Sequence, residues 1–546
     1  MNLHHTSEFI KQHVSIIKII LTIILLGGGI FLRIYKINLG LPYNFIADEA
    51  DIYNTVIKIS LNYKFMKNLQ DFAPPSYVYG MFPTYFLLIC TMTLNKISSV
   101  FHFHINFDFY HVYLRTITAI FSLFIPFFTY QIHKKIFNKK QNSILVFLLT
   151  VLNWKLISYS RYLNQDIYLT TLFISSIYFF ISYINEKSNR STLYLVLSSM
   201  LFGFAVGTKI TALISLPIIL FCLLYKKKYK DTIIFLFGIV LFFSISNPFS
   251  IINFQSFLSR IISMKTREAG VVFSSVNQNP LKYIKAFSDI LSPPTLIISL
   301  FGIIFIFKDL ISKRQQKEIT DTSLTHIFLI GNLFIYFLFF SLNPRLVQRW
   351  VLPVIPIFFV YIPFGLNGIS EMIKNKKTAA FLRYSLAIVI ITFNLITSIL
   401  IIKQINIGDT RVSAYLWVKE YLKDNDRSNY KILVYTNKGN DPFSSIKNSD
   451  VELFKVYESA NAAEYKPRNL AEYDIVITYS DMKKNYNNDY VIKNYPDYNY
   501  SWLSFENEIN NPNDFAIIKE FKTVNPDLLG MSDIYIYEKV KKQTPD

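Results

Sequence analysis

The sequence is poor in cysteine, and it lacks the glycine-rich loops that bind nucleotides. Its two cysteines, Cys90 and Cys222, lie in apolar runs far apart in the chain, so we predict no disulfide framework. No GxGxxG fingerprint is present. Lys209 does not belong to a Walker A loop, because Ile210 follows it and the first glycine is misplaced. These absences count against a nucleotide-sugar enzyme with a Rossmann-like site and against a P-loop NTPase.

Acidic residues are outnumbered by basic ones, 37 to 56, which gives a net charge of +19. In a soluble protein this balance would suggest nucleic acid as a partner. Here the lysines fall in short loops between apolar runs, where they set orientation and meet anionic lipid head groups. We therefore expect the lipid bilayer as a partner and no nucleic acid.

Long apolar runs fill residues 16–402. Hydrophobic residues make up 52% of the chain and the mean hydropathy is +0.30, more than a soluble domain needs. Most runs approach the roughly 20 residues that a helix needs to cross a bilayer. The runs are 16–34, 79–97, 111–131, 142–159, 167–184, 191–207, 210–225, 231–247, 293–309, 324–341, 350–367 and 379–402.

The basic loops predict the orientation. Those near residues 133–140, 226–228, 313–317 and 374–377 all face the cytoplasm if 79–97 is a re-entrant or surface-lying helix instead of a span. We therefore predict an α-helical polytopic membrane protein with about eleven spans in residues 1–402 and a cytoplasmic N-terminus. Residues 36–110 and 248–292 are then outer loops, and the chain is integral to the cell (inner or plasma) membrane.

The composition changes near residue 403. Residues 403–546 are polar, and 410–422 has helical spacing with Asp409 as its N-cap. This stretch predicts a soluble extracytoplasmic α/β domain. Its expected strands are 432–435, 451–457, 475–478, 516–521 and 534–537.

Asp48 and Glu49 follow the first apolar run directly. Charge next to hydrocarbon is costly, so acidic groups at this place suggest a functional site. One carboxylate could act as a general base on an acceptor hydroxyl, while its neighbour orients the acceptor or holds a cation. The alternative is that both acids favour the N-terminus of the following helix.

A second group of polar residues lies between the runs 142–159 and 167–184. Arg161, Asn164 and Asp166 fall on the same predicted outer face as Asp48. A second acid there allows two interpretations. The two acids could form an acid pair, or they could bind a hard divalent cation such as Mg or Mn. The alternative is a helix-end pair in which Asp166 caps the next helix.

Basic residues on the outer face are candidates for binding phosphate. Lys209 interrupts an apolar stretch, and Arg345 and Arg349 flank another; Arg267 lies in the loop 248–292. Arginine grips phosphate oxygens with two donors, and lysine supplies a point charge. The alternatives are a snorkelling lysine, boundary arginines and a surface helix.

Two further sequence patterns imitate metal-binding or nucleotide-sugar sites, but each has a simpler explanation. His102, His104 and His111 lack a tight i,i+4 pair and lie in an aromatic stretch, so we expect no metal site there. Asp424-Asn425-Asp426 imitates the DxD of nucleotide-sugar enzymes, but its position between a helix and a strand is typical of a turn.

The order of these motifs resembles the GT-C class of membrane glycosyltransferases. The dolichyl-phosphate-mannose protein mannosyltransferases and the bacterial aminoarabinose transferases are the families that it resembles. The similarity covers about residues 16–400. It rests on Asp48-Glu49, Pro74-Pro75-Ser76-Tyr77, Tyr79-Gly80-Met81-Phe82-Pro83, Arg115, Ser160-Arg161, Asn164 to Ile167, Gly207-Thr208-Lys209, and Arg349 with Leu352, Pro353 and Pro356.

The resemblance implies a transferase that takes a sugar from a polyprenyl-phosphate donor to an acceptor lipid, glycan or protein outside the membrane. Asp48 would be the base of an inverting displacement, with Glu49 beside it and Asp166 in support. Lys209, Arg345 and Arg349 would hold the donor phosphate, and Tyr79, Arg161, Asn164 and Arg267 would bind substrate. Some relatives hold a divalent metal through a Glu and a His on outer loops. Here the matching stretch is Gln70-Asp71-Phe72-Ala73, and 248–292 has no His, so we expect no such zinc site.

Two other functions stay open. A lipid-linked glycan polymerase or ligase shares the substrate and topology, but would place key arginines in a large outer loop. A secondary transporter would show inverted repeats and charge at the midplane, and the sequence has no internal repeat.

Overall fold

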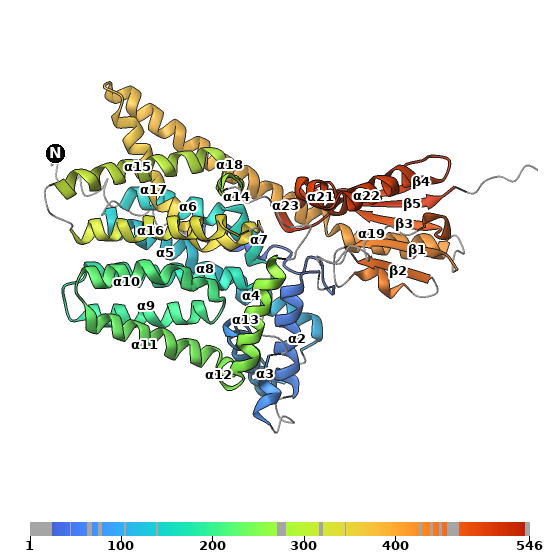
Figure 1. The fold of residues 1–546 in the computed structure, drawn as a ribbon, viewed down its shortest axis with the longest axis horizontal. Coiled ribbons are helices and arrows are strands. Elements are labelled where there is room, and N and C mark those ends of the chain that lie inside the picture. Colours follow the sequence, from blue (N-terminus) through green and yellow to red (C-terminus); the bar gives the residue numbers. More distant parts are fainter. Residues whose placement is uncertain are drawn as a thin grey trace, which may run out of the picture.

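The structure is a computed structural model that describes residues 24–540 with internal gaps. The gaps are 44, 63–67, 75–78, 103–104, 138–139, 270–279, 316–319, 344–345, 425–428, 437–440, 447–449 and 456–468. A bundle of helices is followed by a smaller domain built on a β-sheet, and the two lie end to end (Figure 1).

Eight helices in the described residues are long and apolar enough to cross a membrane. They are α3 (Phe82–Phe101), α4 with α5 (Phe107–Ser122 and Phe124–Phe137), α8 (Gln165–Asn185), α11 (Tyr229–Ser246), α15 (Pro293–Gln315), α16 (Asp321–Ser341), η4 with α17 (Gln348–Val354 and Ile355–Glu371), and α18 (Lys376–Ile407) with α19 (Thr410–Asp424). A bent pair, α6 (Lys140–Leu152) and α7 (Trp154–Ser160), makes a ninth if it is one span, with a 54° break.

The remaining predicted runs are shorter apolar helices. They are Ile24–Ile34, α9 (Arg190–Val206), and η3 (Ile210–Ser215) with α10 (Leu216–Tyr225). Each predicted run therefore coincides with a helix in the described part of the chain. α3 is unbroken, so 79–97 does not fold as a helix–turn re-entrant segment, and its surface placement stays a prediction.

α8 is the centre of the bundle. In its 18-residue apolar stretch, 89% of the residues are buried, and the helix packs against α5, α9, α16 and η4. A helix that is hydrophobic on all sides is stable only when neighbours surround it. Its first turn carries Asp166, so the most enclosed helix of the bundle also fixes one of the predicted site residues.

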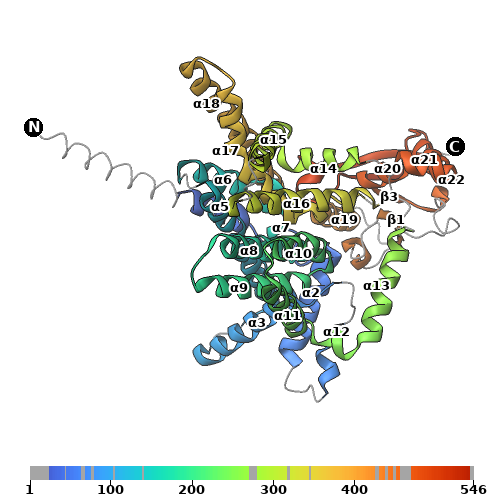
Figure 2. The ribbon, with the colours of Figure 1, turned by 60° about the vertical axis from the view of Figure 1, so that its left-hand side comes forward.

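The end of the bundle that faces the C-terminal domain is crossed by two helices. These are α2 (Ala47–Asn62) and α13 (Phe254–Ala269), which lie beyond the ends of α9, α10 and α11 and are steeply inclined to them (Figures 1 and 2). Shorter elements complete the bundle, namely η2 (Leu69–Phe72), α12 (Pro248–Ile252) and α14 (Leu281–Leu291).

The C-terminal domain has a five-stranded sheet in the order β2-β1-β3-β5-β4. β1 pairs in parallel with β2 and β3, while β5 runs antiparallel to β3 and β4. All five predicted strands are confirmed: β1 (Lys431–Thr436), β2 (Asp450–Lys455), β3 (Ile475–Tyr479), β4 (Phe515–Phe521) and β5 (Ile534–Lys539). α19 is also confirmed, and Asp409 caps it by accepting a hydrogen bond from the backbone N–H of Arg411 at 2.9 Å.

Four helices of this domain were not predicted. They are α20 (Ser480–Tyr486), α21 (Asp489–Asn494), α22 (Pro496–Ile509) and α23 (Pro526–Leu529). The shortest, α23, docks on the bundle. Leu528 and Leu529 share a buried cluster with Trp154 of α7 and Ile401 of α18. The domain is thereby fixed against the helix that leads into the Arg161–Asp166 turn.

Candidate active site

Four predicted residues from separate parts of the chain meet in one cluster. Lys209 Nζ lies 2.7 Å from Asp166 Oδ1, and Arg349 Nε lies 3.2 Å from Asp166 Oδ2. Arg349 also reaches Asp48, with Nη2 3.5 Å from Oδ2. The guanidinium of Arg349 therefore bridges the two acids, and the cluster has two positive and two negative charges.

Asp166 is held firmly in this cluster. It lies in the first turn of α8, and its backbone N–H donates to Asn164 Oδ1 at 2.8 Å, so Asn164 is the N-cap. The Asp166 carboxylate is 2% exposed and faces Lys209 and Arg349. It does not cap α8, as the alternative interpretation of the sequence proposed. Asn164 is thus placed to position Asp166, with its oxygen committed to the helix.

Lys209 is fixed by a junction of two predicted motifs. Gly80 N–H donates to Thr208 O and Phe82 N–H donates to Gly207 O, each at 3.1 Å. Asn247 links the two segments of this junction: its side chain accepts from Met81 N–H at 2.7 Å and donates to Gly207 O at 2.9 Å. A Cβ on Gly80 would lie 2.0 Å from Gly207 O, which explains glycine at that position.

The same junction places Tyr79 over the cluster. Lys209 Nζ lies 5.5 Å from the centre of the Tyr79 ring. Burial, and after it the neighbouring Asp48 carboxylate, raises the pKa of the Tyr79 phenol. Tyr79 therefore stays a neutral hydroxyl beside the acid that we predicted to be a base.

Glu49 lies apart from Asp48, although the two are neighbours in the sequence. Its carboxylate is fully buried and makes two bonds with Arg115, Oε1 to Nε at 2.6 Å and Oε2 to Nη2 at 2.9 Å. His111 Nε2 lies 3.0 Å from Oε1. Burial alone would raise the pKa of Glu49, but Arg115 and His111 lower it from 4.5 to about 2. Both carboxylate oxygens of Glu49 are thus engaged by Arg115 and His111, and the catalytic role expected from the sequence stays a prediction.

Arg161 is likewise committed to the fold. It is 1% exposed, and its guanidinium donates to four backbone carbonyls, those of Leu32, Arg33, Tyr35 and Lys36, at 2.7–3.2 Å. These carbonyls end the helix Ile24–Ile34, so Arg161 caps that helix. Its donors are occupied there, and the expectation that it binds substrate finds no support in its position.

Several residues considered in the sequence analysis cannot be placed relative to the cluster. Arg345 and His104 lie outside the described residues, as do Asn425 and Asp426. Arg267 belongs to α13, of which only the backbone is described at that position. Within the described ranges no three His, Cys, Asp or Glu side chains group as metal ligands; His111 pairs with Glu49, and Arg349 stands between Asp48 and Asp166.

Sequence reasoning missed a second polar group next to Arg349. Gln348 Oε1 accepts from Lys155 Nζ at 3.1 Å, and Tyr159, one turn after Lys155 on α7, lies next to Arg349. The signal was a lysine and a tyrosine four residues apart within an apolar run, which places both on one face of a helix.

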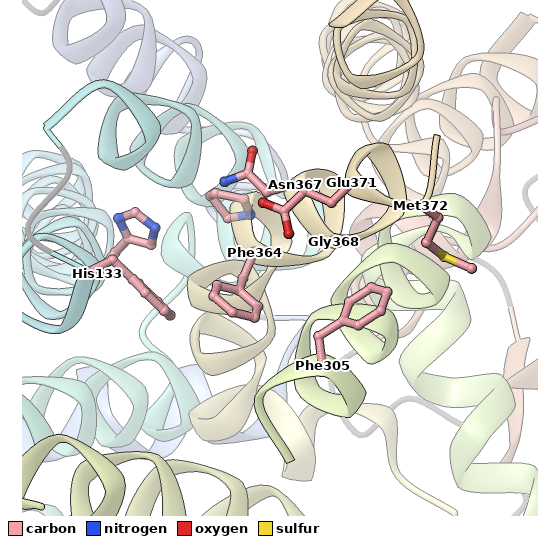
Figure 3. A pocket seen from close by; sticks show the side chains of 9 residues that line it. His133, Phe305, Phe364, Asn367, Gly368, Glu371 and Met372 are labelled. Atoms are coloured by element: carbon pink, nitrogen blue, oxygen red, sulfur yellow. The ribbon is translucent and has the colours of Figure 1, made fainter. Parts of the chain in front are cut away.

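A separate pocket lies at the opposite end of the bundle. It holds about 420 Å³ and is lined by His133, Phe137, Phe305, Pro363, Phe364, Asn367, Gly368, Glu371 and Met372 (Figure 3). α17 begins at Ile355, after Arg349, and the first of its residues to line the pocket is Pro363, so the pocket starts about 12 Å along this helix from the end nearer the acid–base cluster. The pocket is therefore no part of that cluster.

The family model of dolichyl-phosphate-mannose-protein mannosyltransferases matches residues 103–252, which include Asp166 and Lys209. No curated protein sequence matches the chain. Among solved structures, the archaeal oligosaccharyltransferase AglB from Archaeoglobus fulgidus, in complex with an inhibitory peptide and a dolichol-phosphate, is similar at 13% identity. The TM-score is 0.52, and the match covers 88% of this chain and 71% of that one.

ArnT from Cupriavidus metallidurans bound to undecaprenyl phosphate is similar at 9% identity with a TM-score of 0.48. That match covers 94% of this chain and 98% of ArnT. The likeness to the oligosaccharyltransferase, together with the apolar helices, shows that the chain is a polytopic helical membrane protein with the fold of the GT-C class of membrane glycosyltransferases; it also carries a C-terminal α/β domain.

Proposed function

We propose that this protein transfers a sugar from a polyprenyl-phosphate donor to an acceptor at the outer face of the membrane. The observation that carries the proposal is the cluster of Asp48, Asp166, Lys209 and Arg349. An acid that could activate an acceptor lies there beside two cations that could stabilise a phosphate leaving group. The matched family model and the dolichol-phosphate bound by the oligosaccharyltransferase of similar fold support a lipid-phosphate donor.

The donor phosphate would bind at Arg349 and Lys209. Arg349 is 28% exposed, and its buried Nε makes no hydrogen bond of good geometry although it lies at ion-pair distance from Asp166. Lys209 donates one hydrogen bond, to Asp166, out of the three that an ammonium can make. The two remaining donors of Lys209 and the positive charge of the partly exposed Arg349 can offset the negative charge that grows on the phosphate as the bond to the sugar breaks.

Asp48 would be the general base. Of the two acids it is the more accessible, with 13% exposure against 2% for Asp166, and its contact with Arg349 is the longer one. It would take the proton of an acceptor hydroxyl as that oxygen attacks the anomeric carbon, while the phosphate leaves from the opposite face. A single displacement of this kind inverts the anomeric centre.

The reaction is tested with purified protein and a panel of polyprenyl-phosphate sugars. We expect release of free polyprenyl phosphate from at least one donor when an acceptor extract is present, and a product of inverted configuration by NMR. The proposal is wrong if membranes that contain the protein bind polyprenyl phosphate, but no polyprenyl-phosphate sugar of the panel releases its carrier with any acceptor extract of the host.

The outward orientation has its own test. Tyr500 of α22 is 76% exposed in the C-terminal domain, so Tyr500→Cys should react with a membrane-impermeant maleimide on intact cells. The matched variant Lys227→Cys, in the loop after α10, should react only after lysis. The reverse pattern would place the acid–base cluster on the cytoplasmic side and refute the proposed topology.

A further inference from the structure

Lys155 is a buried ammonium that the proposed reaction does not use. It lies in α7 with 6% exposure, and its Nζ donates to Gln348 Oε1 at 3.1 Å. The rings of Trp154 and Tyr159 flank it, with centroids 4.4 and 5.5 Å from Nζ. Among the described residues no carboxylate lies within ion-pair distance of Lys155.

The acids around Lys155 are committed elsewhere. Asp289 Oδ2 accepts from Gln348 Nε2 at 3.2 Å, and Asp527 of α23 pairs with Lys484 at 3.7 Å. Asp48 and Asp166 are matched in charge by Arg349 and Lys209. A buried charge is costly unless it is paired and hydrogen-bonded, yet Lys155 has one hydrogen bond and two ring faces. Asp289 offsets the charge of Lys155, but it contacts the amide of Gln348 and not the ammonium. Lys155 is thereby left with two ammonium donors that have no hydrogen-bond partner among the described residues.

The position of Lys155 places these two free donors next to the candidate active site. Gln348 and Arg349 are consecutive in η4, and Tyr159 contacts both Lys155 and Arg349. Trp154 on the other side packs in the cluster that docks α23 of the C-terminal domain. The ammonium thus lies between the cluster proposed to hold the donor phosphate and the junction of the two domains.

We propose that Lys155, oriented by Gln348, is a second anion-binding subsite that takes a phosphate or carboxylate group of a substrate. The identity of the molecule that carries this group rests on the proposed function. Two carriers have the required chemistry: a donor with a diphosphate, whose second phosphate reaches Lys155, or an acceptor with an anionic group next to its reacting hydroxyl.

The test compares Lys155→Met with wild type and with Lys419→Met, an exposed lysine of α19 as matched control. Purified full-length proteins are titrated with undecaprenyl phosphate, undecaprenyl diphosphate and inorganic pyrophosphate, and thermal unfolding gives the half-saturating concentrations. Hydrogen bonds to a charged group are strong enough that losing Lys155 should weaken binding of the relevant anion tenfold or more. Lys155→Arg should retain most of it, and Lys419→Met should match wild type.

The outcomes separate the two carriers. A loss of tenfold or more confined to the diphosphate carrier supports the donor as its source. Unchanged binding of both carriers, with a raised KM for an anionic acceptor and an unchanged kcat, supports the acceptor. Unchanged affinities for every probe and an unchanged acceptor KM would overturn the subsite and leave Lys155 a structural residue.

Two further measurements keep the test independent of folding and of the proposed reaction. If Lys155→Met does not fold, Gln348→Leu should show the same selective loss, because it removes the acceptor that orients the ammonium. If wild type transfers no sugar but still binds pyrophosphate in a manner that depends on Lys155, the proposed function fails while the subsite stands.

Discussion

The buried pair of Glu49 and Arg115 offers a sharp test of how the site is built. Arg115→Met would leave the Glu49 carboxylate, fully buried, with His111 as its remaining side-chain partner. Removing one partner of a buried ion pair typically costs about 3–5 kcal/mol, because the other charge stays buried without compensation. Arg115 also donates to the carbonyls of Ile37 and Leu39 at 2.8 Å, which adds about 1 kcal/mol for each bond.

A double-mutant cycle separates these terms. Glu49→Leu alone should also destabilise, since it leaves Arg115 buried and unpaired, whereas Arg115→Met with Glu49→Leu should recover most of the loss because an apolar pair can replace a buried ion pair. The assay is reversible unfolding in mixed micelles, followed by circular dichroism. The folded double variant should also retain sugar transfer. Costs that simply add, or a double variant that folds but transfers nothing, would refute the structural role of Glu49.

Further predictions concern single positions. Glu49→Gln should flatten the acid dependence of stability: the pKa of Glu49 is lowered to about 2 from 4.5, so its contribution is full above pH 4.5 and is lost as the pH falls toward 2, a change of roughly 3 kcal/mol that acid titration of unfolding measures. Arg161→Met should lower stability by several kcal/mol, because four carbonyls lose their donor, yet spare transfer per folded molecule; a selective rise in KM would show that Arg161 binds substrate after all. Gly80→Ala should impair folding and transfer together, since its Cβ would lie 2.0 Å from Gly207 O, and wild-type yield and activity would argue against the junction.

The large features of the fold could be predicted because hydrocarbon and water impose them. Apolar runs of membrane length became helices, and β-branched and aromatic runs in the polar C-terminal stretch became the strands of one sheet. The meeting of Asp48, Asp166, Lys209 and Arg349 could also be expected, because lysine loops alone assigned all four to one face of the membrane.

The individual roles depend on side-chain direction, which the sequence does not state. Successive residues of an α-helix point about 100° apart, so Asp48 faces Arg349 while Glu49 faces Arg115. Arg161 and Asp166 share one short turn, yet one caps an upstream helix and the other meets Lys209. Lys155 lies within an apolar run, and only the folded chain brings it from α7 to Gln348 of η4.

In the proposed reaction Asp48 activates the acceptor while Lys209 and Arg349 hold the phosphate. Polyprenyl-phosphate binding and sugar transfer, measured side by side on Asp48→Asn, Lys209→Met and Arg349→Met, test it most directly. We expect Asp48→Asn to bind the carrier like wild type and to transfer at least a hundredfold more slowly, as loss of a general base predicts, and the other two variants to lose binding. Wild-type turnover by Asp48→Asn would contradict the account.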